Sequence, residues 1–157
     1  ALCEAVGGAA ASRFIHNTAR EIGRRDSVSF TERQGVEDPR ARLAAGPVHF
    51  AHAGWAFVEI LPDASPAPND EFFLHYNHPN TFESEVLAKR GEVRKTCACL
   101  FSAGYSSGWC TEAFGLELHG RELKCVAKGD DHCEFILCPS HRLDDHETRV
   151  RATWTTS

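Results

Sequence analysis

The sequence predicts one domain that combines helices with antiparallel strands. Its 157 residues are enough to bury a single hydrophobic core without cross-links. Apolar residues make up 42% of the chain and charged residues 25%, as in folded globular proteins. Segments with helical spacing of apolar residues occur along the chain together with shorter extended segments, and two of these flank a Gly/Asp turn typical of a hairpin.

The first expected element is an amphipathic helix over Leu2–Arg25, where apolar residues recur at roughly helical spacing. A basic pair closes this stretch, which suits the carboxyl end of a helix. Residues 26–47 are polar and show no clear period, so we expect them to be mostly irregular, with a short helix over residues 40–45.

Two neighbouring strands are expected next. Residues 55–61 are rich in Phe, Val and Ile and end at Pro62, where a proline-rich loop begins. Residues 71–77 alternate in a way that suits a second strand, paired antiparallel with the first. Both faces of this second strand look largely covered.

Two helices are expected in the middle of the chain. Asn80 or Thr81 can cap the first, because acidic residues follow in the positions of its first turn. The second is expected over Lys95–Tyr105. Gly104 and Gly108 are expected to loosen the chain at its end.

The last two strands are expected over Leu116–Ala127 and Cys133–Cys138, joined by a turn around Gly129. Pro139 ends the second of them. Residues 140–157 are polar and charged, and we expect them to form a peripheral tail.

Charge and hydropathy argue against two classes of partner. The formal net charge of −5, without a cluster of Lys and Arg, argues against a nucleic-acid surface. The sequence lacks the roughly 18 to 20 consecutive apolar residues of a membrane-spanning helix, and its start lacks a signal-peptide layout, so we expect a cytoplasmic location. The absence of an initial Met indicates either a mature fragment or a piece of a longer chain.

Seven cysteines cannot all pair within one chain, which makes metal binding worth testing against plain buried thiols. The expected hairpin places Cys125 and Cys133 opposite one another, with their Cβ atoms about 4.5 to 5.5 Å apart. Two thiolates at this separation can hold Zn²⁺, and Cys99 and Glu122 are candidates for the other two ligands of a tetrahedral structural site. A disulfide between Cys125 and Cys133 is the alternative.

Glu122 can join this set only if its strand is irregular. It lies three residues before Cys125, and in a regular strand an odd separation puts two side chains on opposite faces. The apolar pattern changes phase along the strand, and Gly120 is the expected position of a bulge. A straight strand would leave three cysteines, with His132 or Cys97 next in line.

The run CLFSAGYSSGW over residues 99–109, followed by Glu122-x-x-Cys125 and by Gly129-x-x-x-Cys133, resembles the 4-vinyl reductase domain family. It also resembles the N-terminal sensor domains of phenol- and toluene-responsive transcription activators. The resemblance is strongest over residues 78–138.

The resemblance implies an α+β fold in which helices pack on an antiparallel sheet, similar to the fold of nitric-oxide-signalling and Golgi-transport proteins. One ligand-binding domain would span residues 1–139. In the sensor branch such a pattern binds structural zinc, and the ligands map onto Cys99, Glu122, Cys125 and Cys133. Four protein ligands leave no open position for water, so this zinc would not be catalytic.

The resemblance further implies a sensor that binds a small hydrophobic or aromatic molecule, with an output domain outside this chain and a homodimer as further partners. A Trp of the phenol sensors is replaced here by His78, which leaves the ligand's identity open. The residues proposed to contact the ligand are His52, Trp55, His78, Phe101, Tyr105 and Trp109.

Two other functions stay as alternatives. One is an enzyme or accessory protein of tetrapyrrole vinyl reduction, although no G-x-G-x-x-G follows a strand as a nicotinamide site would require. The other is a scaffold subunit of a tethering-type complex. The run Gly104–Gly108 matches a G-x-S-x-G nucleophile elbow, but a helical segment precedes it where a strand is needed. We therefore expect a binding module and not an enzyme.

Overall fold

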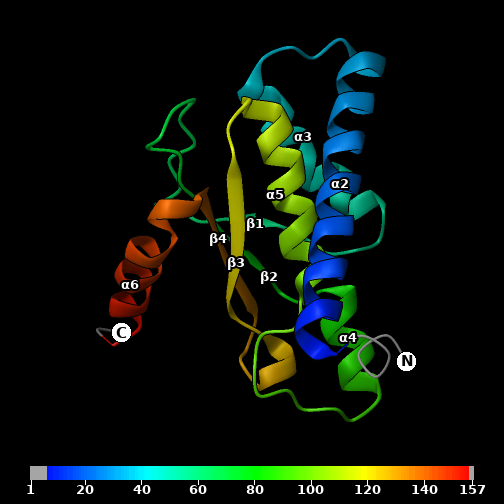
Figure 1. Cartoon of the computed structure of the whole chain (residues 1–157), viewed down its shortest axis with the longest axis vertical. Coiled ribbons are helices and arrows are strands. Elements are labelled where there is room, and N and C mark those ends of the chain that lie inside the picture. Colours follow the sequence, from blue (N-terminus) through cyan, green and yellow to red (C-terminus); the bar gives the residue numbers. More distant parts are fainter. Residues whose placement is uncertain (1–6, 156–157) are drawn as a thin grey trace.

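The computed structural model describes residues 7–155 and shows helices on both faces of an antiparallel sheet (Figure 1). The strands are β1 (Glu59–Ile60), β2 (Leu74–His78), β3 (Leu118–Lys124) and β4 (Cys133–Pro139). They lie in the order β1-β2-β4-β3, and every neighbouring pair is antiparallel. The predicted α+β class and the predicted hairpin are confirmed.

The two long helices α2 (Gly8–Gln34) and α5 (Leu100–Phe114) lie side by side (Figure 1). Their backbones touch at glycines, since a Cβ on Gly108 would lie 1.9 Å from the carbonyl oxygen of Arg20. A Cβ on Gly104 would lie 2.3 Å from another α2 carbonyl oxygen. The expectation that these glycines loosen the chain is wrong, because both lie inside α5 and allow the helices to approach.

The first helix is longer than its sequence pattern predicts. Instead of ending at Arg25 it continues to Gln34 and closes at Gly35, whose φ of 64° is the usual left-handed helix end. Packing explains the extension, because Phe30 contacts the Trp109 ring at a centroid distance of 5.8 Å. The expected start of the helix at Leu2 lies outside the described residues.

The next helix, α3, spans Pro39–His52 and corrects the expectation of a mostly irregular segment with a short helix. Asp38 caps it by accepting a hydrogen bond of 3.1 Å from the backbone N–H of Ala41. Pro47 lies inside the helix and removes one backbone donor. The helix persists because one side of it packs on α5.

The middle elements follow their sequence signals in kind. β1 is shorter than the strand expected over residues 55–61, while β2 pairs with it as predicted. Helix α4 (Phe82–Lys89) is capped by Thr81, whose side chain accepts the Ser84 N–H. Helix α5 begins at Leu100, later than expected, which leaves Cys99 in the capping position.

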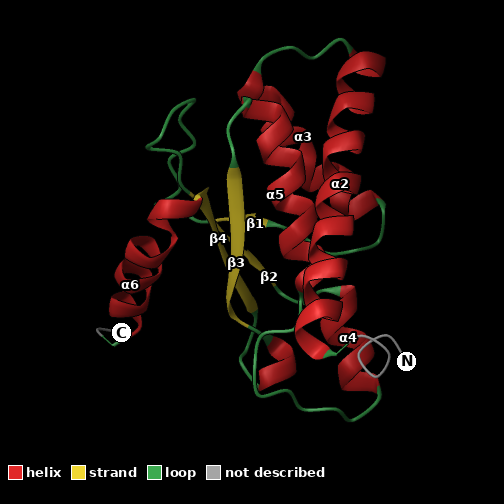
Figure 2. Ribbon diagram, viewed as in Figure 1, coloured by secondary structure: helices red, strands yellow, loops and turns green. Residues whose placement is uncertain are grey.

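The carboxyl-terminal segment differs from the peripheral tail expected over residues 140–157. A short 3-10 turn, η2 (Ser140–Arg142), leads into α6 (Leu143–Trp154), which covers the sheet face opposite α5 (Figure 2). Its Leu143 and Val150 are buried in a small core that includes Phe73 of the sheet. The apolar residues of α6 are few but fall on one side of the helix.

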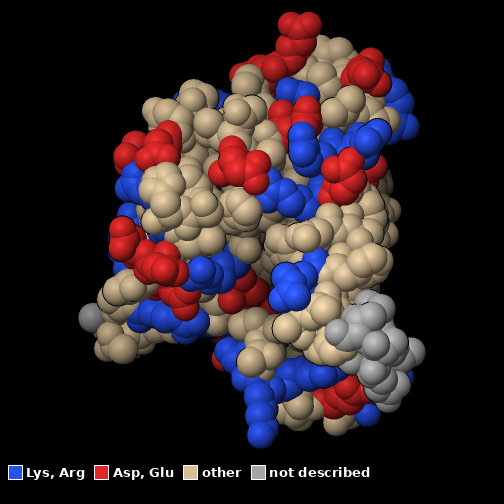
Figure 3. Space-filling view, viewed as in Figure 1, with Lys and Arg blue, Asp and Glu red and all other residues tan. Residues whose placement is uncertain are grey.

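Within the described part of the chain, no helix combines the length and apolarity needed to cross a membrane. On the face shown in Figure 3, acidic and basic side chains are interspersed. A nucleic-acid surface would instead gather Lys and Arg together.

Candidate metal centre and ligand cavity

Three thiols and a carboxylate meet where α5 begins and the β3–β4 hairpin turns. One ligand atom from each of Cys99, Glu122, Cys125 and Cys133 lies within 4.8 Å of all the others. The Cys99 sulfur lies 3.7 Å from each of the other two sulfurs. In a tetrahedral site with metal–sulfur bonds of about 2.3 Å, ligand atoms are about 3.8 Å apart. Among residues 7–155, this is the one group of three or more such side chains placed to hold a metal ion.

A bulge in β3 brings Glu122 to this group. The strand is in register with β4 up to Glu122 and again at Lys124, which leaves Leu123 as the extra residue. The bulge removes the alternation that would separate Glu122 from Cys125 in a regular strand. The predicted irregularity is therefore present, but at Leu123 and not at Gly120.

The ligand atoms have unequal partners. One Glu122 oxygen accepts the backbone N–H of Cys99 at 2.8 Å, whereas the other is buried without a hydrogen-bond partner. The Cys133 sulfur accepts the backbone N–H of Val126 at 3.4 Å, and the Cys99 sulfur lies 3.1 Å from the Thr81 hydroxyl. A buried carboxylate oxygen without a partner is costly, and a cation would remove that cost.

The protonation of the group points the same way. Burial raises the pKa of Glu122 to about 8. Hydrogen bonds from the Cys133 and Cys99 thiols lower the pKa of Cys125, and the same contact with Cys125 raises the pKa of Cys99. The protein by itself thus favours one thiolate among the three, and a complete anionic ligand set requires a cation.

The basic side chains expected to balance this charge are engaged elsewhere. The backbone N–H of Cys125 instead binds the Asp130 carboxylate at 2.7 Å. The ion pairs of the basic residues are Arg121 with Asp144 and Glu147, Lys124 with Glu134, and Lys128 with Asp130.

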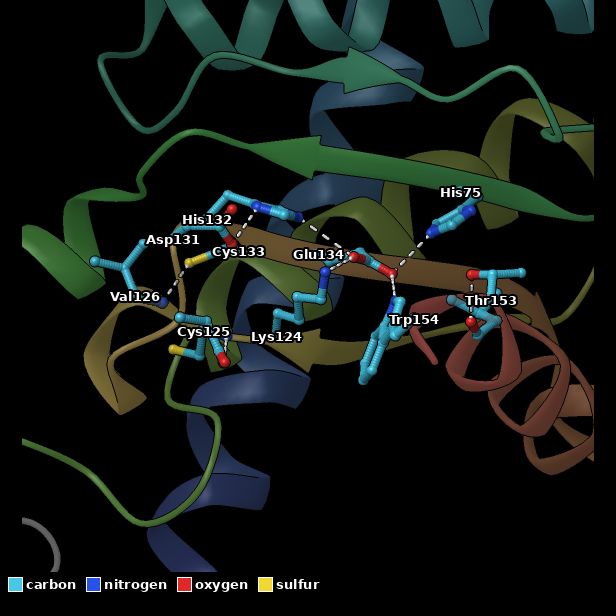
Figure 4. Close-up of polar contacts among 12 residues, drawn as sticks. His75, Lys124, Cys125, Val126, Asp131, His132, Cys133, Glu134, Thr153 and Trp154 are labelled. Carbon is cyan, nitrogen blue, oxygen red and sulfur yellow. Dashed lines mark hydrogen bonds and ion pairs between the residues drawn. The ribbon is translucent and has the colours of Figure 1, made fainter. Parts of the chain in front are cut away.

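A polar hub lies one residue from the cluster, on the other face of β4 (Figure 4). The buried Glu134 carboxylate binds His75 at 3.1 Å, Trp154 at 3.2 Å and Lys124 at 3.0 Å. Burial alone would raise the pKa of Glu134, but the bonds from His75 and Lys124 outweigh it and lower that pKa to about 2. The hub therefore fixes α6 to the strand that carries Cys133.

A second candidate site is a cavity between α3, α5, β1 and β2. Its volume is about 40 Å³, which is room for a few water molecules, since one water needs about 10 to 15 Å³ by this measure. Its walls are mainly apolar and include Phe50, Leu74 and Trp109. The hydroxyl-bearing residues among those that line it are Tyr76, Ser106 and Tyr105.

Of the six residues expected to contact a ligand, Tyr105 and Trp109 line this cavity. Trp55 and Phe101 lie behind the wall, where the Trp55 ring meets Tyr105 at a centroid distance of 4.8 Å and Phe101 at 5.0 Å. His52 is exposed and borders a groove outside the cavity, which shares Pro47 with it.

His78 is completely buried but does not line the cavity. Its Nδ1 donates to the Phe57 carbonyl oxygen at 2.7 Å, and its Nε2 has no partner. Burial lowers the pKa of His78 to about 4, so the ring is neutral near pH 7. It stacks on Phe50, which does line the cavity, at a centroid distance of 5.5 Å.

Sequence reasoning missed Tyr76 and Ser106 as cavity residues. The alternation over residues 71–77 places Leu74 and Tyr76 on one face of β2, and that signal could have identified Tyr76. Ser106 lies within α5, so the G-x-S-x-G run has no strand-to-helix turn here.

Comparison with known proteins agrees with the sequence resemblance. Residues 80–139 match the model of the 4-vinyl reductase domain family, which confirms the predicted resemblance over the part of the chain that holds the cysteine and glutamate cluster. The chain is 27% identical over 140 residues to the phenol regulator MopR of Acinetobacter guillouiae. This match covers 88% of the chain but 25% of MopR, so the chain spans about a quarter of that relative's length.

Two solved structures share the fold. The phenol-responsive sensory domain of the transcription activator PoxR, solved with phenol, matches with a TM-score of 0.79 at 22% identity, over 96% of this chain and 75% of that chain. A trafficking protein particle complex subunit 3 from Naegleria fowleri, covalently bound to palmitic acid, matches with a TM-score of 0.59 at 14% identity, over 83% of this chain and 80% of that chain. The predicted likeness to signalling and Golgi-transport proteins is thereby confirmed for the fold.

Proposed function

We propose that this chain is a sensor-type domain that binds one small aromatic or hydrophobic molecule in the cavity between α3, α5 and the sheet. The observation that carries the proposal is the cavity itself, which has apolar and aromatic walls with a few hydroxyl groups among them. This is the usual composition of a small-molecule site. The small volume favours a single-ring ligand, because a larger one would have to push the helices apart.

The relatives support an aromatic ligand. MopR is named a phenol regulator, and the PoxR sensory domain is described as phenol-responsive. Since MopR is much longer than this chain, we propose an output segment outside this chain, together with a cytoplasmic location and a homodimer. Ligand binding would then shift a conformational equilibrium that the output segment reads.

We further propose that the cluster of Cys99, Glu122, Cys125 and Cys133 binds structural zinc. The sulfur spacing, the unpartnered Glu122 oxygen and the burial of all three thiols support this ligand set. A metal there would fix the start of α5 to the β3–β4 hairpin. Thiolate ligands favour zinc over Mg²⁺ or Ca²⁺, which prefer oxygen.

The ligand half of the proposal is tested by filling the cavity. Cys110 lines it and is buried, so Cys110→Leu should occupy the space that a ligand needs. We expect phenol to raise the melting temperature of the wild-type chain and of Cys110→Ala, and to leave that of Cys110→Leu unchanged. Undiminished phenol binding by folded Cys110→Leu would place the ligand elsewhere.

The metal half is tested by native mass spectrometry of the purified chain. We expect one zinc ion per chain in the wild type and none in Cys133→Ser. Cys138→Ser is the matched control, because Cys138 is equally buried but packs with the α6 core. Zinc-free wild-type protein with full stability would refute the metal site.

A further inference from the structure

The chain contains two tyrosines, and both line the same cavity. Their hydroxyl groups differ. The Tyr105 hydroxyl donates a hydrogen bond of 3.0 Å to Asp26 on α2. The Tyr76 side chain is 2% exposed, and its hydroxyl has no hydrogen-bond partner. One tyrosine is therefore satisfied within the protein fold, and the other is not.

An unpaired hydroxyl at this depth is unusual, because buried polar groups in native proteins are nearly always hydrogen-bonded. Ser106 faces the same cavity from α5 and influences Tyr76, but no hydrogen bond of normal geometry joins their hydroxyls. Each hydroxyl can both donate and accept. The two together leave a donor and acceptor position at the border of the cavity.

The remaining walls limit what can bond there. The described residues that line the cavity include no Lys, Arg or His. A carboxylate placed inside would be buried without a counter-charge, which is strongly unfavourable. Burial also raises the pKa of Tyr76, so its hydroxyl stays protonated and able to donate.

We infer that the Tyr76 and Ser106 hydroxyls are the polar anchor of the cavity and select neutral single-ring ligands that carry one hydroxyl or carbonyl group. This inference rests on the proposed function and names its ligand class. The anchor is thus on β2 and α5, whereas the two histidines predicted to contact the ligand, His52 and His78, lie outside the cavity lining.

The test compares phenol, toluene and benzoate by isothermal titration calorimetry on the whole chain. These probes share a ring and differ in having a hydroxyl group, an apolar methyl group or a carboxylate. We expect the wild type to bind phenol about tenfold more tightly than toluene, as one additional hydrogen bond allows, and not to bind benzoate.

Tyr76→Phe and Tyr105→Phe form a matched pair, since each removes one hydroxyl and keeps a ring in the cavity wall. We expect Tyr76→Phe to reduce the preference for phenol to less than about twofold, at unchanged toluene affinity. Tyr105→Phe should keep the preference. Ser106→Ala should lower it in part, and it tests the anchor independently of Tyr76.

Three results would overturn the inference. They are an unchanged phenol preference in both Tyr76→Phe and Ser106→Ala, loss of the preference in Tyr105→Phe instead, and benzoate binding as tight as that of phenol. In each case the cavity would still bind an aromatic ring, so the proposed function would stand. Failure of the wild type to bind either phenol or toluene would instead refute the proposed function and the inference together.

Discussion

The two oxygens of Glu122 distinguish a metal ligand from a capping residue. One oxygen accepts the Cys99 N–H, and the other has no partner in the protein. A capping role needs only the first oxygen, which a glutamine can replace. A metal ligand needs the negative charge, which a glutamine lacks.

We therefore expect Glu122→Gln to keep the fold at saturating zinc but to lower zinc affinity by at least about 10- to 100-fold, the usual loss even for outer-shell changes. Competition with a chromogenic chelator measures this. Glu83→Gln is the control, because Glu83 is a buried carboxylate that accepts the Phe101 and Ser102 N–H groups near the cluster without belonging to it. Equal losses in both variants would show that Glu122 acts only as a cap.

His78 gives the stability of the chain a pH dependence. Burial lowers its pKa from 6.5 to about 4, so below pH 6.5 the unfolded state binds a proton that the native state rejects. Stability is therefore fully present above this range and is lost as the pH falls. Between about pH 7 and pH 5 the loss from this group is about 2 kcal/mol.

The variant His78→Asn can keep the donor to the Phe57 carbonyl but cannot titrate. Urea unfolding at about pH 7 and pH 5 should show a smaller loss of free energy of unfolding in the variant, by about 2 kcal/mol. The other titrating groups are the same in both proteins, so the difference reports His78 alone. Parallel pH profiles would contradict the assigned pKa.

At the scale of elements, short-range signals in the sequence predict structure well where capping and alternation decide it. Thr81 caps α4, and the Gly129 turn joins β3 to β4, as their sequence signatures indicate. The same signals bring Cys125 and Cys133 together. The position of the bulge at Leu123 was not predictable, because that residue is apolar and its burial against α6 selects the register.

Contacts between distant segments decide the elements that the sequence did not predict. The polar end of α2 is helical because Phe30 packs on Trp109, far away along the chain. Gly104 and Gly108 are interpreted as helix breakers when only propensity is considered, yet they are contact points of two helices. Most of the cavity residues were missed for the same reason, since the cavity exists only where α3, α5 and the sheet meet.

The contact between α2 and α5 predicts the effect of a single methyl group. In Gly108→Ala the new Cβ would lie 1.9 Å from a backbone oxygen, which cannot move without shifting α2. We expect a loss of about 3 kcal/mol, the upper end for overpacking. Gly8→Ala is the control, because nothing lies within 4 Å of its Cβ, and it should change the unfolding free energy by less than about 1 kcal/mol. Similar urea midpoints for both variants would contradict close helix packing.

The whole molecule places its two candidate sites at different positions along one helix. Cys99 immediately precedes α5, and Tyr105, Ser106 and Trp109 of α5 line the cavity. Among the described residues, none belongs to both sites. A ligand that fills the cavity therefore bonds to a helix whose start depends on the metal cluster.

Zinc removal should consequently weaken ligand binding without any change in the cavity residues. We expect chelation of the wild type to lower the melting temperature, to speed amide exchange over residues 81–101 and 120–135, and to reduce phenol affinity several-fold. Added zinc should restore all three, because binding to the native state alone stabilises it by mass action. Cys133→Ser should resemble the chelated wild type and respond to neither treatment, whereas Cys138→Ser should behave as the wild type does. If phenol affinity is the same with and without zinc while the exchange rates change, α5 does not transmit order from the cluster to the cavity, and the two sites act independently.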